Sequence, residues 1–351
     1  MSRILSPLDW TAMRRLLVVL PSWVGDATMA TPLLACLRHD AKLRRAQIVG
    51  YMRPGLDDLL DGCALFDEVM VGKPDGLFGP WSEGRRLTGG HFDAAILLPN
   101  SWRLAATIRL ARIPYRIGYD RDARGWMLTH PLASPAPGGW KQPIPAIDYY
   151  LAIAESIGIG RGGREMRLRA SAAQQAAGAA ILQRAGVREG EGYAILNPGA
   201  SKPEKRWPVD RFAALADHLA DAHSLKVLVN GSPGERRIIA EVCAASRSHP
   251  ADLVQLGITL GSLKHIASRS RLLVTNDTGT RHIAAASAAG CVPAPQPSAL
   301  AILSLFGPTD PRWAQIEYER EKQISVRGKP MAEIPLDTVR LACDELLGHR
   351  P

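Results

Sequence analysis

Residues 274–282 have the side-chain types of an anion-binding turn. An apolar strand there runs into a short polar turn and then into a run of helix-forming residues. Free backbone N–H groups at a helix start, together with the helix dipole, stabilise a phosphate. A glycine within the turn allows the backbone to approach such a ligand closely. The candidate contacts are Asp277, Thr278, Gly279, Thr280 and His282; a plain capping turn is the alternative.

A second small-residue loop, residues 197–201, follows another apolar strand and leads into the basic run 205–208. Pro208 marks the start of a helix. Backbone N–H groups and the Ser201 hydroxyl could hold phosphate oxygens, and Lys205 could place a positive charge beside them. A solvated basic loop is the alternative.

A third loop, residues 21–26, directly follows the first apolar strand of the chain. Gly25 permits a tight turn there. Asp26 then lies at the carboxyl end of a strand, which suits a general base. The alternative is that Asp26 only caps the helix that follows.

A fourth loop, residues 230–235, follows the second strand of the second half. The Glu235 carboxylate could accept hydrogen bonds from a ribose, as acidic residues do in dinucleotide-binding folds. A plain β-to-α turn is the alternative.

Short apolar strands alternate with amphipathic helical stretches in both halves of the chain, and they must position these loops. The predicted strands are residues 16–20, 47–51, 68–71, 94–98 and 116–118, then 193–197, 226–230, 253–256, 272–275 and 301–306. The predicted helices are residues 29–38 and 102–112, then 172–185, 209–221, 234–246, 263–268 and 281–288. This alternation predicts an α/β fold with two mostly parallel sheets, whose ligands bind at the carboxyl ends of the strands.

The length of 351 residues indicates two domains, predicted as residues 1–165 and 166–351. The glycine-rich stretch 158–163 is the predicted linker. A last helix, residues 336–347, could close the second domain or pack back on the first.

Composition narrows the class of protein. A net charge of +9 suits an anionic substrate or membrane, but no basic block interleaved with aromatics indicates nucleic-acid binding. Five scattered cysteines indicate a reducing compartment without disulfides or a zinc site. No apolar run is long enough for a signal peptide or a membrane span, so we expect a cytoplasmic protein. No Walker loop, GxGxxG, HExxH, serine elbow or metal-ligand spacing is present.

Taken in order along the chain, these loops resemble the ADP-heptose lipopolysaccharide heptosyltransferases. The matching segments are residues 21–26, 100–101, 113–119, 197–200, 205–208, 275–282 and 306–311. The Ser-Trp-Val-Gly-Asp form of the first segment is most similar to the branch of the family that adds the second heptose. The resemblance implies a GT-B fold, in which two Rossmann-like domains face a central cleft.

The resemblance also implies an inverting transfer of heptose from ADP-L-glycero-D-manno-heptose to the lipopolysaccharide inner core, without a metal or other cofactor. Asp26 matches the general base and Lys205 the lysine that stabilises the departing ADP. Residues 277–279 and His282 match the donor-binding turn, Ser201 a hydroxyl residue near the diphosphate, and Glu235 a ribose contact. The N-terminal half would then bind the lipid-linked, anionic acceptor and the C-terminal half the donor.

Further acceptor contacts are predicted less specifically, from Gly25, Asn100, Ser101, Arg116, Arg121 and Arg124. For the three arginines a solvated basic face is an equal alternative. We expect a monomer that touches the cytoplasmic face of the inner membrane transiently and binds no nucleic acid.

Two departures from the family bear on the substrates. Residues 290–299 add a proline-rich stretch after the donor-binding helix, and the cysteine-bearing region usual near the C-terminus of the family is replaced by residues 326–331. Two alternatives therefore remain: a GT-B enzyme that uses another nucleotide sugar for a different surface glycan, and a non-catalytic nucleotide-sugar binding protein.

Overall fold

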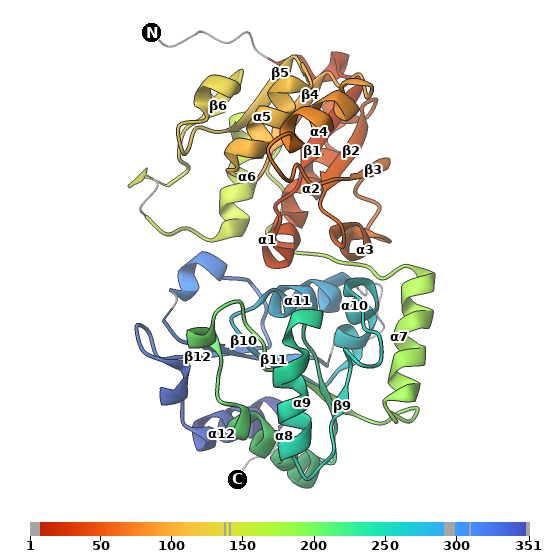
Figure 1. Ribbon diagram of the computed structural model, residues 1–351, viewed down its shortest axis with the longest axis vertical. Coiled ribbons are helices and arrows are strands. Elements are labelled where there is room, and N and C mark those ends of the chain that lie inside the picture. Colours follow the sequence, from red (N-terminus) through yellow and green to blue (C-terminus); the bar gives the residue numbers. More distant parts are fainter. Residues whose placement is uncertain (1–7, 137, 140–141, 291–298, 309, 349–351) are drawn as a thin grey trace. The chain divides into compact units, whose positions relative to one another are not determined.

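The computed structural model describes residues 8–136, 138–139, 142–290, 299–308 and 310–348 (Figure 1). The chain divides into two compact units. The first unit runs to Leu60 and also contains Ala64–Glu165 and Arg312–Gln315. The second contains Asp61–Cys63, Met166–Pro311 and the chain from Ile316 onward.

The first unit is built on a parallel six-stranded sheet with the order β3-β2-β1-β4-β5-β6. Its strands are β1 (Arg15–Val19), β2 (Gln47–Met52), β3 (Glu68–Val71), β4 (Ala94–Leu97), β5 (Tyr115–Tyr119) and β6 (His130–Leu132). Its helices are α1 (Val24–Met29), α2 (Thr31–His39), α3 (Leu56–Leu60), α4 (Gly79–Thr88), α5 (Trp102–Leu110) and α6 (Ala146–Ser156). The central strands β1 and β4 are apolar and buried apart from Arg15, the first residue of β1, because helices bury both faces of a parallel sheet.

The second unit repeats this plan with the order β12-β11-β10-β7-β8-β9. Its strands are β7 (Tyr193–Asn197), β8 (Lys226–Val229), β9 (Ala251–Asp252), β10 (Leu272–Asn276), β11 (Ala301–Phe306) and β12 (Glu321–Ser325). Its helices are α7 (Ala172–Arg184), α8 (Val209–His223), α9 (Arg236–Ala245), α10 (Leu260–Arg269), α11 (Gly279–Gly290) and α12 (Leu336–Leu347).

Both sheets have the strand order of nucleotide-binding Rossmann folds. In each, the first strand of the unit has the second strand on one side and the fourth on the other. Chain direction across the sheet reverses at that point, which opens a crevice at the carboxyl ends of the two central strands. The topology therefore selects the loops after β1 and β4 in the first unit, and those after β7 and β10 in the second.

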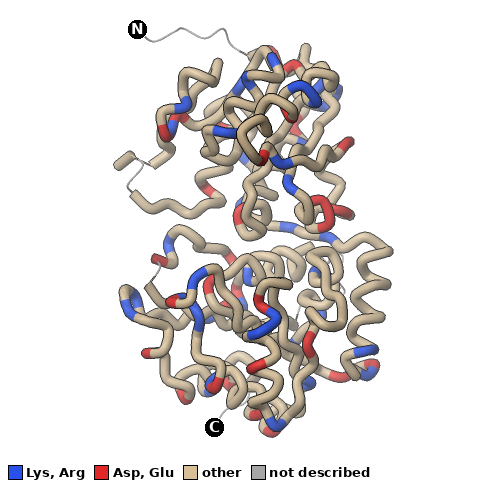
Figure 2. Tube along the Cα trace, in the orientation of Figure 1, with Lys and Arg blue, Asp and Glu red and all other residues tan. Residues whose placement is uncertain are grey.

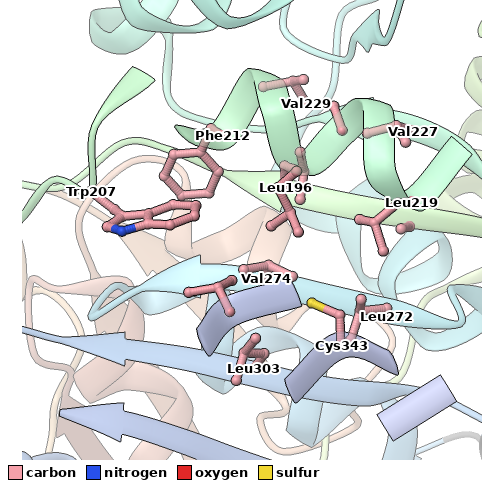
Figure 3. Packing of buried hydrophobic residues seen from close by; sticks show 14 of the residues in the cluster. Leu196, Trp207, Phe212, Leu219, Val227, Val229, Leu272, Val274, Leu303 and Cys343 are labelled. Atoms are coloured by element: carbon pink, nitrogen blue, oxygen red, sulfur yellow. The ribbon is translucent and has the colours of Figure 1, made fainter. Parts of the chain in front are cut away.

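The core of the second unit explains where the last helix goes (Figure 3). Trp207 is fully buried, packs edge-on against Phe212 at 5.1 Å between ring centroids, and donates its indole N–H to the Ile334 carbonyl at 2.9 Å. Val339 and Cys343 of α12 belong to the same cluster. Of the two arrangements that the sequence left open, α12 covers the second sheet.

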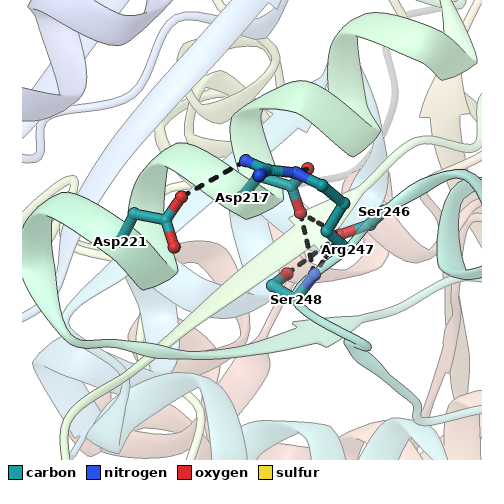
Figure 4. A network of polar contacts seen from close by, with 5 residues as sticks. All are labelled: Asp217, Asp221, Ser246, Arg247 and Ser248. Atoms are coloured by element: carbon teal, nitrogen blue, oxygen red, sulfur yellow. Dashed lines mark hydrogen bonds and ion pairs between the residues drawn. The ribbon is translucent and has the colours of Figure 1, made fainter.

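A polar network ties α8 to the end of α9 (Figure 4). Asp217 of α8 accepts hydrogen bonds from the Ser246 hydroxyl at 2.7 Å and the Ser248 backbone N–H at 2.9 Å, and pairs with Arg247 at 3.2 Å. These bonds hold the pKa of Asp217 below its ordinary value, although burial acts in the opposite direction.

The predicted strand 253–256 is wrong. The strand ends at Asp252, whose side chain accepts the backbone N–H groups of Val254 and Gln255 and turns the chain. The predicted helix 29–38 corresponds to α2, which begins at Thr31; Met29 is the last residue of the preceding helix α1.

The predicted linker 158–163 lies within the first unit, and the unit boundary falls at Glu165. Gly160 donates its N–H to the Asp40 carboxylate at 3.1 Å, and Gly162 donates to the Cys36 sulfur at 3.1 Å. Those bonds fix a stretch whose composition indicated flexibility.

One short segment of the first half belongs to the second unit. Lys264 of α10 is buried, and its ammonium donates to the carbonyl oxygens of Asp61 at 2.7 Å and Arg169 at 3.0 Å. Gly62 lies between them with a positive φ of 78°, and a Cβ there would lie 2.6 Å from the Ser171 nitrogen. Only glycine fits that position.

No helix within the described ranges is both long and apolar enough to cross a membrane. Four of the cysteines, Cys36, Cys63, Cys243 and Cys343, are free thiols, and the fifth lies outside the described residues.

Candidate active site

Asp26 lies in the first turn of α1, at the carboxyl end of β1. The residue before this helix is Trp23, and no side chain caps the helix start. The capping alternative for Asp26 is therefore not what the structure shows. Its carboxylate is instead placed beside the buried Tyr150 of α6.

The surroundings of Asp26 favour its protonated form. Burial raises the pKa of the Asp26 carboxyl above its ordinary value, and the Tyr150 hydroxyl, which donates to it, offsets part of that rise. Burial, followed by the Asp26 charge, raises the pKa of Tyr150 well above its ordinary value. A carboxylate with a raised pKa holds a proton more readily, as a general base must.

The loop after β4 joins this site through Asn100. Its amide N–H donates to the Tyr149 hydroxyl at 2.7 Å, and its carbonyl oxygen accepts from Arg124 at 3.2 Å. Ser101 caps α5 by accepting the Leu104 N–H at 3.3 Å. Gly25 lies within α1, beside Asp26.

The predicted acceptor contacts of Arg124 and Arg116 are wrong. Arg124 is fully buried, and its guanidinium also donates to the carbonyl oxygens of Tyr119 and Pro99, so it positions the Asn100 loop. Arg116 lies near the amino end of β5, the opposite edge of the sheet, and donates to the carbonyl oxygens of Met127 and Ile113.

Arg121 is placed differently from those two arginines. It follows β5 at the carboxyl edge, lies 3.9 Å from the Asp122 carboxylate, and helps to keep down the burial-raised pKa of Tyr149. Arg121 therefore remains a candidate contact for the acceptor.

In the second unit, Asn197 connects the loops that the strand order selects. Its side-chain oxygen Oδ1 accepts hydrogen bonds from the Asn230 side-chain amide at 2.8 Å and the Thr280 hydroxyl at 3.0 Å. Its amide donates to the Thr278 hydroxyl at 3.3 Å. The ends of β7 and β8 and the start of α11 therefore form one hydrogen-bonded group, and Gly279 is the first residue of α11.

Lys205 and Asp277 form an ion pair at this end of the sheet. The Lys205 ammonium lies 3.0 Å from the Asp277 carboxylate, and only 19% and 16% of the two side chains are exposed. A carboxylate repels a diphosphate, so the structure gives the Asp277 side chain the role of fixing the lysine; its contact with the donor stays a prediction. An ammonium has three N–H donors, which leaves Lys205 able to contact a further acceptor.

Glu235 lies against the loop after β7. Its carboxylate accepts from the backbone N–H and hydroxyl of Ser232 at 2.7 and 2.8 Å. A Cβ at Gly199 would lie 2.1 Å from a carboxylate oxygen of Glu235. Glycine at 199 is what lets this carboxylate approach the candidate phosphate loop.

His282 differs from its prediction because the structure buries it. Burial, followed by the neighbouring Arg281 charge, holds its pKa well below its ordinary value, so the imidazole is neutral. Its Nδ1 has no hydrogen-bond partner among the described residues. Almost none of the ring is open to a ligand. Ser201, by contrast, is exposed in the loop after β7.

The sequence did not indicate the roles of several residues in these sites. Tyr150 was not singled out, and Asn197 was predicted only as the first residue of the loop 197–201; the fold shows what their side chains contact. Arg281, predicted to lie in a helix, is fully buried and forms a bidentate pair with Glu321 of the edge strand β12. That pair anchors the start of α11.

Among the described residues, one group of three could hold a metal ion: His218, His223 and Asp344. Both imidazoles lie within hydrogen-bonding distance of the same Asp344 oxygen, at 2.8 and 2.6 Å. The group joins α8 to α12, and none of its members lies in the loops selected by the strand order.

Two Rossmann-type units, each with polar loops at the point where the strand order reverses, define the GT-B class of glycosyltransferases. The sequence profile of glycosyltransferase family 9 (heptosyltransferase) matches residues 81–334, and the chain belongs to this family. The predicted fold class, the resemblance and the assignment as a glycosyltransferase are confirmed.

Individual relatives agree with the family. Lipopolysaccharide heptosyltransferase 2 of Salmonella typhimurium is 28% identical over 322 residues, which are 85% of this chain and 84% of that protein. A family 9 glycosyltransferase structure from Veillonella parvula has a TM-score of 0.83 at 19% identity and covers 98% of this chain and 99% of that one. The structure of E. coli ADP-heptose lps heptosyltransferase II has a TM-score of 0.78 at 22% identity, with coverages of 95% and 98%.

Proposed function

We propose that this glycosyltransferase transfers heptose from ADP-L-glycero-D-manno-heptose to the inner core of lipopolysaccharide. The observation that carries the proposal is the Lys205–Asp277 pair at the start of α11, in a chain similar to lipopolysaccharide heptosyltransferases. A held ammonium beside a helix N-terminus suits the diphosphate of a nucleotide sugar.

In the proposed mechanism Asp26 takes the proton of an acceptor hydroxyl. The hydroxyl oxygen forms a bond to the anomeric carbon, the bond from that carbon to the diphosphate breaks, and ADP leaves with the electron pair. Attack from the side opposite the leaving group inverts the anomeric centre. Lys205 and the N–H groups at the start of α11 stabilise the charge that develops on the leaving diphosphate.

The remaining site residues support this division of labour. The first unit would bind the acceptor through Asn100, Ser101 and Arg121, and the second would bind the donor. Ser201, Thr278 and Thr280 offer hydroxyls to the diphosphate, and Glu235 accepts from the ribose. We propose no metal or other cofactor for this step.

Because the proposed acceptor is lipid-linked, we propose that the enzyme works at the cytoplasmic face of the inner membrane. We also propose that it is a monomer. The proline-rich stretch 290–299, which could influence donor choice, lies mostly outside the described residues.

A donor screen tests the proposal. The chain is incubated with a Kdo–lipid A acceptor that already carries one heptose, and nucleotide release is measured with ADP-heptose and with common UDP- and GDP-sugars. We expect release of ADP only. Turnover of a UDP-sugar without any turnover of ADP-heptose would assign the enzyme to a different surface glycan.

Variants then test the residue roles. Lys205→Ala should lower kcat about 100-fold or more, the magnitude typical of losing one group that stabilises transition-state charge. Lys202→Ala is the matched control, because Lys202 lies in the same loop with 68% of its side chain exposed. Asp26→Asn should abolish turnover and retain ADP binding. Equal losses for the two lysines would remove Lys205 from its proposed role.

A further inference from the structure

The outward faces of α4 and α5 are unusually apolar and aromatic for helices on a sheet surface. Their inward faces are buried, since Leu87, Leu104 and Ile108 belong to the hydrophobic core beneath them. Large apolar side chains nevertheless remain exposed on and around the outward faces: Leu77, Phe78, Trp81, Trp102, Leu110 and Trp126. The three tryptophans are 52–61% exposed. A helix face left to water is normally polar.

Arginines interleave with these aromatic rings. The Arg85 guanidinium lies over the Trp81 ring at 4.9 Å, and that of Arg109 lies over the Trp126 ring at 5.0 Å. The rings of Trp126 and Trp102 are 6.4 Å apart. Since α4 packs beside α5, and α5 contacts the turn that carries Trp126, these groups share one surface. We call it the basic aromatic face; Figure 2 shows the lysines and arginines of the whole chain in blue.

A hollow of about 560 Å³ lies between the two helices in this face. It is lined by Trp81, Arg85, Thr88, Gly89, Arg109, Leu110 and Arg112, with no carboxylate among them. Within the described residues no ion pair joins Arg85, Arg109 or Arg112 to an acidic group. Arg86 differs, because it pairs with Glu83 at 2.7 Å.

Unpaired cations around exposed tryptophans fit one chemistry best. Tryptophan favours the headgroup level of a bilayer, where one part of its ring is apolar and another is wet. Arginine reaches lipid phosphates with a forked set of donors and contributes about 1 kcal/mol near an anionic surface. A protein surface with exposed aromatic rings and basic side chains can bind to a membrane without a helix that crosses the bilayer.

We propose that the basic aromatic face docks the protein on an anionic phospholipid bilayer. Trp81, Trp102 and Trp126 enter the headgroup layer, and Arg85, Arg109 and Arg112 contact lipid phosphates. The inference extends the proposed function, whose acceptor is lipid-linked, by naming the surface that meets the membrane.

Vesicle sedimentation tests the docking. The full chain is mixed with vesicles of phosphatidylcholine alone, or with 30 mol% phosphatidylglycerol, at two salt concentrations. We expect binding only to the anionic vesicles and a loss of binding at high salt. The triple variant Arg85→Ser, Arg109→Ser, Arg112→Ser should bind these vesicles about 100-fold more weakly, from roughly 1 kcal/mol per arginine.

The matched control removes the same charge elsewhere, with Arg44→Ser, Arg45→Ser and Arg188→Ser. These arginines are exposed and lie outside both candidate sites. Equal losses in the two triple variants would show a general charge effect and overturn the proposal, as would wild-type binding by the first. A competition experiment gives a further test. If dissolved glycerol phosphate at millimolar concentration displaces the protein from the vesicles, a site for small anions explains the binding, and the docking proposal is overturned.

Transferase assays separate this inference from the proposed function. With the acceptor embedded in anionic vesicles, the Arg85, Arg109 and Arg112 variant should lose activity. With a delipidated, water-soluble acceptor it should match wild type. If wild type turns over neither acceptor but still binds vesicles through this face, the proposed function fails and the docking surface stands.

Discussion

Replacing Tyr150 by phenylalanine tests whether Asp26 is the base. The Tyr150 hydroxyl is the group that holds down the burial-raised pKa of Asp26. Without it, nothing offsets the burial, and the carboxyl pKa rises further. A base works only when it is deprotonated, so the acid limb of the kcat/KM profile should move to higher pH.

The size of the effect follows from the hydrogen bond that is lost. A hydrogen bond to a charged group contributes about 1.5–3 kcal/mol, and about 1.4 kcal/mol corresponds to a factor of ten. On the acid limb we therefore expect Tyr150→Phe to lower kcat/KM about 10- to 100-fold. Well above the limb, where Asp26 is deprotonated in both proteins, the two rates should converge.

The assay is the rate of ADP release across a pH series with the soluble acceptor. Tyr149→Phe is the control, because Tyr149 is the adjacent residue of α6 and its hydroxyl binds the Asn100 amide. It should change the KM for the acceptor and leave the acid limb in place. An acid limb that does not move in Tyr150→Phe, or that moves equally in both variants, would refute the link between Tyr150 and the base.

Three further outcomes follow from the structure. Because folding raises the pKa of Asp26, ionisation of this carboxyl lowers the free energy of unfolding once the pH exceeds the pKa of Asp26 in the unfolded chain. Asp26→Asn should therefore raise the thermal midpoint at pH 7–8. The difference between the midpoints of the variant and wild type should vanish below about pH 4. Glu321→Gln strands the buried Arg281 charge and should cost about 3–5 kcal/mol, seen as a lower denaturation midpoint, whereas an unchanged midpoint would show that the pair is dispensable. Gly199→Ala should displace Glu235 and raise the KM for the donor about 3- to 10-fold with kcat retained; an unchanged KM would exclude Glu235 from the donor site.

Much of the fold could be predicted because hydrophobic periodicity records it. The strands β3, β7 and β11 and the helix α12 begin and end where the sequence indicates. The edge strand β12 was missed because its residues Glu-Lys-Gln-Ile-Ser carry little apolar signal. Strand order, which selects the loops that matter, depends on long-range pairing that no local pattern records.

The candidate site was predictable to the level of loops and not of side-chain roles. A polar turn at the start of a helix indicates an anion-binding site in any fold. Whether Asp277 binds that anion or holds Lys205, and whether Arg124 points outward or is buried beneath Asn100, depends on residues about 25 to 70 positions away. Such partners are set by packing, and sequence spacing alone does not give them.

The tripeptide Asp61–Cys63 restricts how the two units of this enzyme can be expressed separately. A gene fragment that begins at Met166 would omit the Asp61 carbonyl, one of the two backbone acceptors that the fold gives to the buried ammonium of Lys264. The second unit therefore cannot be excised whole with one cut. A chimera that joins it to a different first unit must carry a matching tripeptide from the foreign chain, glycine at its centre included.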